Sequence, residues 1–144
     1  MMTGIFNSKR DREEIVERVA AAVNSGDFEL VEKAIRRGWI DPNMEMSNGR
    51  ALLAMVARKC PLHTVELLVA KGAKIDSVSL ITAVVAGRAN VVRFFLEKGA
   101  DTTERMGTGF DALDYANFYE HKEIAEMIKA DRARHIATLQ RNAK

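Results

Sequence analysis

The sequence holds few residues whose types and spacing could support catalysis or bind a metal. Its histidines, His63, His121 and His135, are not spaced three or four residues apart, as two metal ligands on one helix face would be, and no HExxH motif occurs. The single cysteine, Cys60, precedes Pro61 and has no neighbouring base that would activate a thiol. We therefore predict that Cys60 is a small buried side chain and that the histidines bind no metal.

Two further local patterns have explanations other than catalysis. Residues 107–110 read GTGF and lack both the Lys-Ser/Thr of a phosphate-binding loop and the third glycine of a dinucleotide-binding motif. They are typical of a hairpin turn. Asp111 and Asp114 flank the start of a predicted helix, where carboxylates accept hydrogen bonds from free N–H groups. We expect neither catalysis nor a cofactor, a metal or a small-molecule substrate.

Composition narrows the class of protein further. The chain has 144 residues, with 47% hydrophobic and 29% charged residues and a net charge of +2, which is typical of one folded domain. Its apolar runs, such as residues 51–57, are far shorter than the roughly 18 residues that a membrane span needs. Residues 1–10 do not resemble a secretory signal, and a single cysteine excludes an internal disulfide. We expect a cytoplasmic protein that does not contact a membrane.

The elements that would position any site recur along the chain. Three similar runs, GDFELVEKAIRRG, CPLHTVELLVAKG and GRANVVRFFLEKG, end at Gly38, Gly72 and Gly99, and a fourth, EHKEIAEMIKADR, keeps only the apolar positions. Seven residues before each run lies a further shared apolar position, occupied by Val19, Leu53, Leu80 and Leu113. Four copies that agree in two halves indicate an internal repeat.

One copy of the repeat has the pattern of a helical hairpin. Apolar residues from Leu30 to Ile35 recur at the spacing of one helical face. Asp27 is a suitable N-cap for that helix, and Gly38 can adopt the left-handed conformation that ends it. Neither helix of a copy can bury its apolar face alone, so neighbouring copies must stack. The sequence therefore predicts an all-α protein.

The segments GRANVVRFFLEKGAD and ALDYANFYEHKEIAEMI resemble the second helix and the last repeat of ankyrin repeat proteins. The resemblance covers roughly residues 15–130, although the family's Thr-Pro-Leu-His signature is absent. It implies a solenoid of four stacked helix-turn-helix repeats with short β-hairpin fingers, and a structural role for His121. The short, divergent repeats resemble bacterial or phage ankyrin proteins more than long eukaryotic arrays.

The repeat pattern also predicts where the domain begins and ends. We expect a flexible N-terminus at residues 1–7, an ankyrin repeat domain at 8–130, with repeats at 8–43, 44–76, 77–103 and 104–130, and a basic helical extension at 131–144. The net charge is −3 over residues 105–128 and +4 over residues 129–144. The basic extension is interpreted as a solvated helix end.

Unequal spacing predicts that one finger is truncated. Leu53 and Leu80 lie 27 residues apart, whereas the other neighbouring copies are 33 and 34 residues apart. A full finger therefore does not fit at residues 74–79. Full fingers are expected at 43–50, where Asn-Gly predicts a two-residue turn, and at 102–110. The two full fingers would then be separated by a notch.

The resemblance places a partner-binding surface on the concave side, formed by the fingers and first helices. Its predicted residues are Met44, Met46, Asn48, Arg50, Arg58, Lys59, Val85, Met106, Phe110, Phe118 and Tyr119. Phe118 and Tyr119 are either exposed interface anchors or side chains packed under the C-terminal helix. The three methionines either contact a partner or fill the space between neighbouring fingers.

These features favour a non-enzymatic protein-interaction module that is monomeric when free. A small stack has little to connect, which favours a stoichiometric inhibitor, immunity protein or regulator of one folded partner. A scaffold or adaptor is the alternative. A third possibility is a nucleic-acid-associated regulator that uses Arg50, Arg58, Lys59 and the basic tail, although 22 basic against 20 acidic residues do not indicate polyanion binding.

Overall fold

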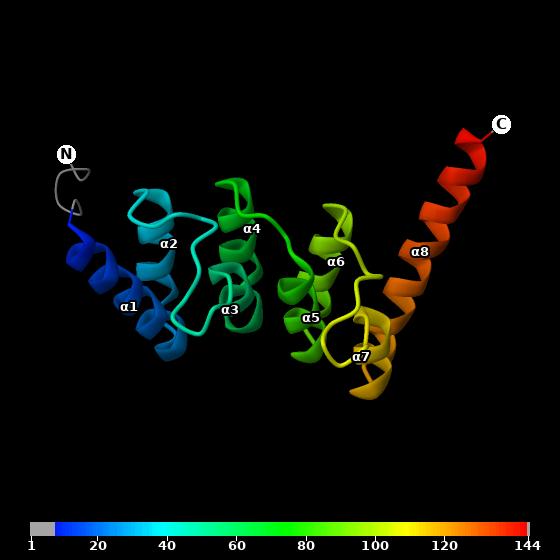
Figure 1. Ribbon diagram of the computed structural model, residues 1–144, viewed down its shortest axis with the longest axis horizontal. Helices are drawn as coiled ribbons and strands as arrows, with labels where there is room; N and C mark the ends of the chain where they lie inside the picture. Colours follow the sequence, from blue (N-terminus) through cyan, green and yellow to red (C-terminus); the bar gives the residue numbers. More distant parts are fainter. Residues whose placement is uncertain (1–7, 144) are drawn as a thin grey trace. The chain divides into compact units, whose positions relative to one another are not determined.

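The structure, a computed structural model, describes residues 8–143, which form helices joined by turns and loops (Figure 1). The predicted flexible N-terminus, residues 1–7, lies outside the described residues. The chain divides into two compact units, one ending at Ile75 and the other beginning at Asp76. Unit 1 contains α1 (Lys9–Ser25), α2 (Phe28–Arg36), α3 (Leu52–Lys59) and α4 (Leu62–Ala70); unit 2 contains α5 (Ser77–Val85), α6 (Ala89–Glu97), α7 (Ala112–Phe118) and α8 (Lys122–Asn142).

Unit 1 consists of two helical hairpins that stack side by side. Helix α1 packs against α2 and α3 against α4 within each hairpin, while α1 contacts α3 and α2 contacts α4 between them. Val19 and Leu53, which occupy the repeated apolar position, are 0% and 1% exposed. As predicted, Asp27 is the N-cap of α2, where its carboxylate accepts a hydrogen bond from the N–H of Leu30.

A buried carboxylate joins the two hairpins of unit 1. Glu32 on α2 is 8% exposed and accepts a 2.9 Å hydrogen bond from the Thr64 hydroxyl at the start of α4. Its second oxygen accepts a 2.9 Å hydrogen bond from Arg36, and His63 Nδ1 lies 2.7 Å from the oxygen that Thr64 contacts. His63 is solvent-exposed, yet it contributes to the packing of α2 on α4.

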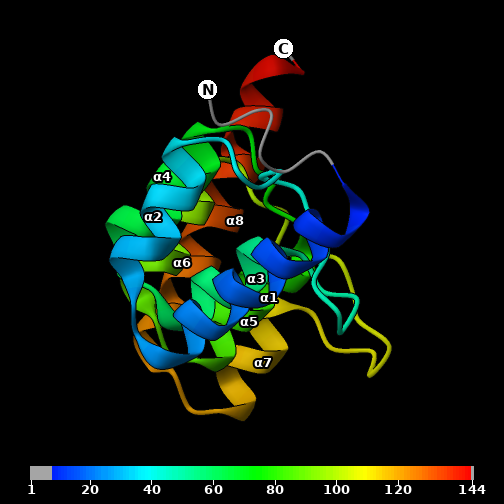
Figure 2. The same cartoon turned by 90° about the vertical axis from the view of Figure 1, so that its left-hand side faces the viewer.

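Unit 2 repeats the same arrangement. Helix α5 packs on α6 and α7 on α8, with α5 against α7 and α6 against α8 (Figure 2). Leu80, Phe95 and Ile128 are completely buried in its core. Leu113, the fourth residue of the repeated apolar set, is only half-buried. The four hairpins confirm the predicted all-α solenoid of helix-turn-helix repeats.

The two full fingers are tight turns with little β-structure. In the first, the Met46 N–H donates to the Arg50 carbonyl at 2.7 Å, and the β-pairing is a single bridge between Glu45 and Ala51. Gly49 has φ 78°, as the predicted Asn-Gly turn requires. In the second, the Met106 N–H donates to the Phe110 carbonyl at 2.9 Å. The fingers therefore contain less β-pairing than the predicted hairpins.

The link between α4 and α5 confirms the truncated finger. Helix α4 ends at Ala70 and α5 begins at Ser77, so residues 74–79 contain no hairpin. Asn43 is connected to this link within unit 1: its side chain donates to the Gly72 carbonyl at 2.9 Å and accepts from the Lys74 N–H at 2.7 Å. The predicted notch involves fingers from different units and stays a prediction.

Helix α8 is far longer than the second helices of the other hairpins. It has 21 residues, whereas α2, α4 and α6 have 9 each. The predicted basic extension is thus the continuation of α8, whose last turns project beyond α6 in Figure 1. Ile136 and Leu139 on these turns are 55% and 68% exposed. None of the helices in residues 8–143 combines the length and apolar character that crossing a membrane requires.

Candidate functional site

Three exposed aromatic side chains form a continuous cluster on unit 2, called here the aromatic face. Phe110, Phe118 and Tyr119 are 36%, 66% and 46% exposed. The Phe118 ring centroid lies 5.9 Å from that of Phe110 and 5.1 Å from that of Tyr119. Of the two interpretations left open by the sequence, the structure supports exposure, because α8 does not cover these rings.

The second finger holds one side of the aromatic face in place. Phe110 lies directly before α7 and makes an edge-to-face contact with Tyr115, at a centroid distance of 5.4 Å. The Tyr115 hydroxyl is 2.8 Å from the Thr108 hydroxyl, which connects the fingertip to α7. Finger and helix thus support each other, and Phe110 reaches Phe118, the last residue of α7.

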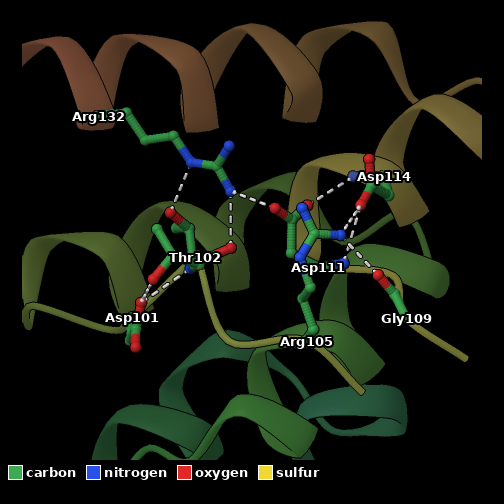
Figure 3. A network of polar contacts seen from close by, with 8 residues as sticks. Asp101, Thr102, Arg105, Gly109, Asp111, Asp114 and Arg132 are labelled. Carbon is green, nitrogen blue, oxygen red and sulfur yellow. Dashed lines mark hydrogen bonds and ion pairs between the residues drawn. The ribbon is translucent and has the colours of Figure 1, made fainter. Parts of the chain in front are cut away.

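Arg105 closes the base of the same finger. Its Nη1 donates to the Gly109 carbonyl at 2.6 Å and lies 3.5 Å from Asp114 Oδ2 (Figure 3). Asp111 and Asp114 form the predicted helix cap of α7, as a capping box in which each side chain accepts the other residue's N–H at 3.0 Å. These contacts fix where the finger meets α7.

His121 supports the other side of the aromatic face. Its ring stacks on Tyr119, with a centroid distance of 6.3 Å and an interplanar angle of 16°. Its Nε2 lies 3.2 Å from the Val85 carbonyl at the end of α5. The ring also rests on Gly87, where a Cβ would lie 2.9 Å from His121 Cε1. These contacts agree with the structural role that the resemblance implies.

Glu120 adopts an unusual backbone conformation beside the aromatic face. It has φ 60°, the only positive φ of a non-glycine residue among those described. At the corresponding interhelical turns of the first and third hairpins the residue is a glycine, Gly26 with φ 85° and Gly87 with φ 72°. The Glu120 side chain is exposed and makes no hydrogen bond or ion pair within residues 8–143. Its conformation is therefore unfavourable and is not offset by a contact of the side chain.

We expect Glu120→Gly to raise the free energy of unfolding by about 1 kcal/mol. Glycine adopts the left-handed region without the penalty that a Cβ incurs there. The removal of this penalty outweighs the entropic cost of glycine's greater freedom in the unfolded chain. Urea denaturation followed by far-UV circular dichroism measures the difference. A decrease in stability would show that the Glu120 side chain holds the turn in place.

Arg132 links α8 to the finger and to α7. Its Nε donates to the Thr102 hydroxyl at 2.9 Å, and its Nη2 donates to the Thr102 carbonyl at 2.7 Å and to Asp111 Oδ2 at 3.1 Å (Figure 3). The sequence placed Arg132 in a solvated basic tail, and for this residue that interpretation is wrong. Three hydrogen bonds to largely buried groups make it a structural residue.

The charges around this network lower the pKa of two carboxyl groups. Burial raises the pKa of Asp111, but the Asp114 N–H and the Arg132 guanidinium outweigh it and leave the pKa below its ordinary value. The Thr103 hydroxyl and N–H lower the pKa of Asp101, with burial opposing them and Arg132 adding to them. Both groups are therefore held in the ionised form.

We expect unit 2 to lose stability in acid. A carboxyl group whose pKa is lower in the folded chain stabilises it fully above the unfolded pKa, and this contribution is lost as the pH falls through the folded pKa. For Asp101 and Asp111 the loss lies below the ordinary value of 3.8. Urea denaturation between pH 2.5 and 6 measures it. In Asp111→Asn the decline should be smaller, and an unchanged decline would contradict the assignment.

The remaining predicted site residues differ in exposure. Asn48, Arg50, Arg58 and Lys59 of unit 1 are exposed, whereas Met44, Val85 and Met106 are half-buried. Met46 is 6% exposed and lines a hollow with residues of α1, which leaves little of its surface for the predicted contact with a partner. Its apolar side chain is buried because the finger folds back beside α1.

Side chains of the types that bind metals are scattered through the described residues. No three His, Cys, Asp or Glu side chains among them gather closely enough to hold a metal ion. An open hollow of about 650 Å³ lies between α6 and α8, away from the aromatic face. It is lined by Arg93, Glu97, Asp131, Arg134 and His135 among others, and Asp131 already pairs with Arg134 and His135. The acidic group that α8 contributes to this hollow is thus already paired within its own helix.

Comparison with known families agrees with this architecture. The family model that describes ankyrin repeats in three copies matches residues 19–106. The chain belongs to the ankyrin repeat family, whose repeats are protein-interaction modules and generally act without catalysis.

Several curated proteins are similar in sequence to part of this chain. Ankyrin repeat and SAM domain-containing protein 6 of Rattus norvegicus is 35% identical over 113 residues, which cover 74% of this chain and 13% of that protein. A Transient receptor potential cation channel subfamily A member 1 homolog of Caenorhabditis elegans is 31% identical over 109 residues, which cover 72% of this chain and 9% of that protein. Protein VAPYRIN-LIKE of Medicago truncatula is 39% identical over 83 residues, which cover 56% of this chain and 18% of that protein. The chain thus spans less than a fifth of the length of each.

Proposed function

We propose that the chain is a non-enzymatic module that binds a folded protein partner through the finger and first-helix surface of unit 2. The observation that carries this proposal is the aromatic face. Apolar rings that remain exposed although finger and helix hold them firmly are favoured interface anchors, because little side-chain freedom is lost on binding. Within this proposal, the module acts in the cytoplasm as a stoichiometric inhibitor, immunity protein or regulator.

A nucleic-acid-binding function is the second candidate, but fewer basic side chains are available for it than the sequence indicated. Arg50, Arg58 and Lys59 are exposed on unit 1, as that function requires. Arg132, however, is held by Thr102 and Asp111 and is not available to a phosphate. Binding to DNA or RNA should weaken steeply with salt, so the absence of any mobility shift at low salt dismisses this candidate.

The proposed function is tested by identifying what contacts the aromatic face. A photo-crosslinking amino acid at position 118 captures the partner, which is identified by mass spectrometry, purified and mixed with the wild-type chain. We expect Phe118→Ala/Tyr119→Ala to weaken binding of the purified partner by at least about tenfold, because buried aromatic anchors are each worth 1 kcal/mol or more. Equal binding by the double variant overturns the proposal.

The matched control removes the same kind of side chain from another exposed place. Ile136→Ala/Leu139→Ala truncates two residues that are as exposed as the aromatic pair and lie on the last turns of α8. This variant should bind the partner like the wild type. Titration of the partner's own activity then distinguishes an inhibitor, which acts fully at one equivalent, from a scaffold, which leaves that activity unchanged.

A further inference from the structure

The aromatic face adjoins an anionic group that the fold itself does not use. Glu120 follows Tyr119 directly, is exposed and makes no hydrogen bond or ion pair through its side chain within the described residues. Its φ of 60° is a conformation that glycine would adopt at lower cost, as Gly26 and Gly87 do at the equivalent turns. The carboxylate is thus kept at a position where it costs stability and makes no intramolecular contact.

Most other charged side chains of this stretch are already paired. Residues 105–128 carry five acidic side chains against two basic ones. Of the two basic side chains, Arg105 is already occupied by Gly109 and Asp114. The other, Lys122, is exposed at the start of α8 and partly offsets Glu120. Four of the five acidic side chains are already paired: Asp111 with Arg132, Asp114 with Arg105, Glu123 with Arg93 and Glu126 with Lys129. What the aromatic face offers a cation is therefore the Glu120 carboxylate together with the exposed ring faces.

Resting on the proposed function, we infer that the aromatic face recognises a polypeptide segment through a cationic side chain, an arginine in particular. The planar guanidinium stacks on Phe118, the most exposed ring of the aromatic face, while it hydrogen-bonds to the Glu120 carboxylate; the Tyr119 ring stands at 73° to Phe118 and borders the same place with its edge or face. Arginine suits this surface better than lysine because its flat, weakly hydrated head can stack and form a two-point hydrogen bond to the carboxylate at the same time. The partner is accordingly a protein that presents arginine beside apolar residues.

Two peptides that differ only in charge test the inference. One is a short Gly/Ser peptide with a central Leu-Arg-Leu-Arg segment, and the other has citrulline in place of each arginine. Both are titrated into the ¹⁵N-labelled full-length chain and followed by NMR. We expect the arginine peptide to shift the Tyr119, Glu120 and His121 amide signals and to bind about two- to fivefold tighter than the citrulline peptide for each arginine engaged. Equal binding of the two peptides overturns the inference.

Matched variants separate the two interactions. Glu120→Gln keeps the shape of the side chain and should reduce the preference for arginine over citrulline, whereas Glu97→Gln, at an exposed carboxylate on α6, should not change it. Phe118→Ala/Tyr119→Ala should abolish the shifts of the amide signals at 119–121. A Glu120→Gln variant with an undiminished preference contradicts the role of the carboxylate.

The outcomes also separate this inference from the proposed function. If the arginine and citrulline peptides bind alike but Phe118→Ala/Tyr119→Ala still weakens binding of the purified protein partner, the interface stands and its charge preference is wrong. If the double variant keeps the partner, the interface itself is wrong. A second copy of the chain could also supply the cationic segment. Sedimentation of the free chain at increasing concentration detects such self-association. If the chain self-associates and the peptide-induced NMR shifts depend on its concentration, the assignment to a separate partner is overturned.

Discussion

Gly87→Ala should lower the free energy of unfolding by about 2–3 kcal/mol, the sum of a backbone penalty and a lost side-chain contact. At φ 72° an alanine pays about 1–2 kcal/mol for its Cβ alone. That Cβ would also lie 2.9 Å from His121 Cε1, so the ring must move and its hydrogen bond with the Val85 carbonyl is broken or weakened. Urea denaturation followed by far-UV circular dichroism measures the loss.

The chain contains a glycine that separates these two contributions. Gly99 has φ 86°, but a Cβ there would meet no atom within 4 Å. Gly99→Ala should therefore cost only the backbone term of about 1–2 kcal/mol. In a His121→Ala background the effect of Gly87→Ala should fall to the same value, because no ring is left to displace. Equal effects of Gly87→Ala in both backgrounds would show that the contact with His121 carries no energy.

Much of the fold could be predicted because the repeat makes the same local demands in every copy. Val19, Leu53 and Leu80 are buried as their shared position requires, and the spacing between Leu53 and Leu80 alone located the missing finger. The prediction was weakest where the copies differ from one another. Leu113 is half-buried, and the fourth run begins with Glu120, which adopts the left-handed conformation although it is not a glycine.

The site could be predicted only in part, because exposure depends on contacts between distant residues. The sequence located the aromatic residues near α7 but did not decide whether α8 covers them. Met46 was expected to face a partner and is buried beside α1. The contact between Glu32 and Thr64 joins residues 32 positions apart and has no local pattern that could have indicated it. Such contacts follow from the stacking of hairpins, which the repeat predicts only in outline.

Arg132 shows most clearly how the stacked elements depend on one residue. It is the only side chain of α8 among those described that hydrogen-bonds both the finger base, at Thr102, and the N-cap of α7, at Asp111. Asp111 is 8% exposed and Thr102 4%, so their polar groups depend on this guanidinium rather than on water. The orientation of the finger relative to α7, and with it the position of Phe110, follows from this contact.

We expect Arg132→Ala to lower the free energy of unfolding by about 2–4 kcal/mol. The substitution removes three hydrogen bonds, one of them to a carboxylate, and leaves the Asp111 charge largely buried without its counter-ion. Arg132→Lys should restore only a small part, since a single ammonium group cannot reproduce the spread of donors that reaches both Thr102 and Asp111. Urea denaturation at pH 7 measures both variants.

Arg134→Ala is the matched control for Arg132→Ala. Arg134 lies on the same helix, is mostly exposed and pairs with Asp131 at 3.5 Å, so its loss should cost no more than about 1 kcal/mol. The stability difference between the wild type and Arg132→Ala should also narrow as the pH falls below 3.8, because protonated Asp111 no longer attracts the guanidinium. Equal losses in the two variants, or a difference that does not change with pH, would mean that Arg132 acts only by covering apolar surface and that finger orientation does not depend on its charge.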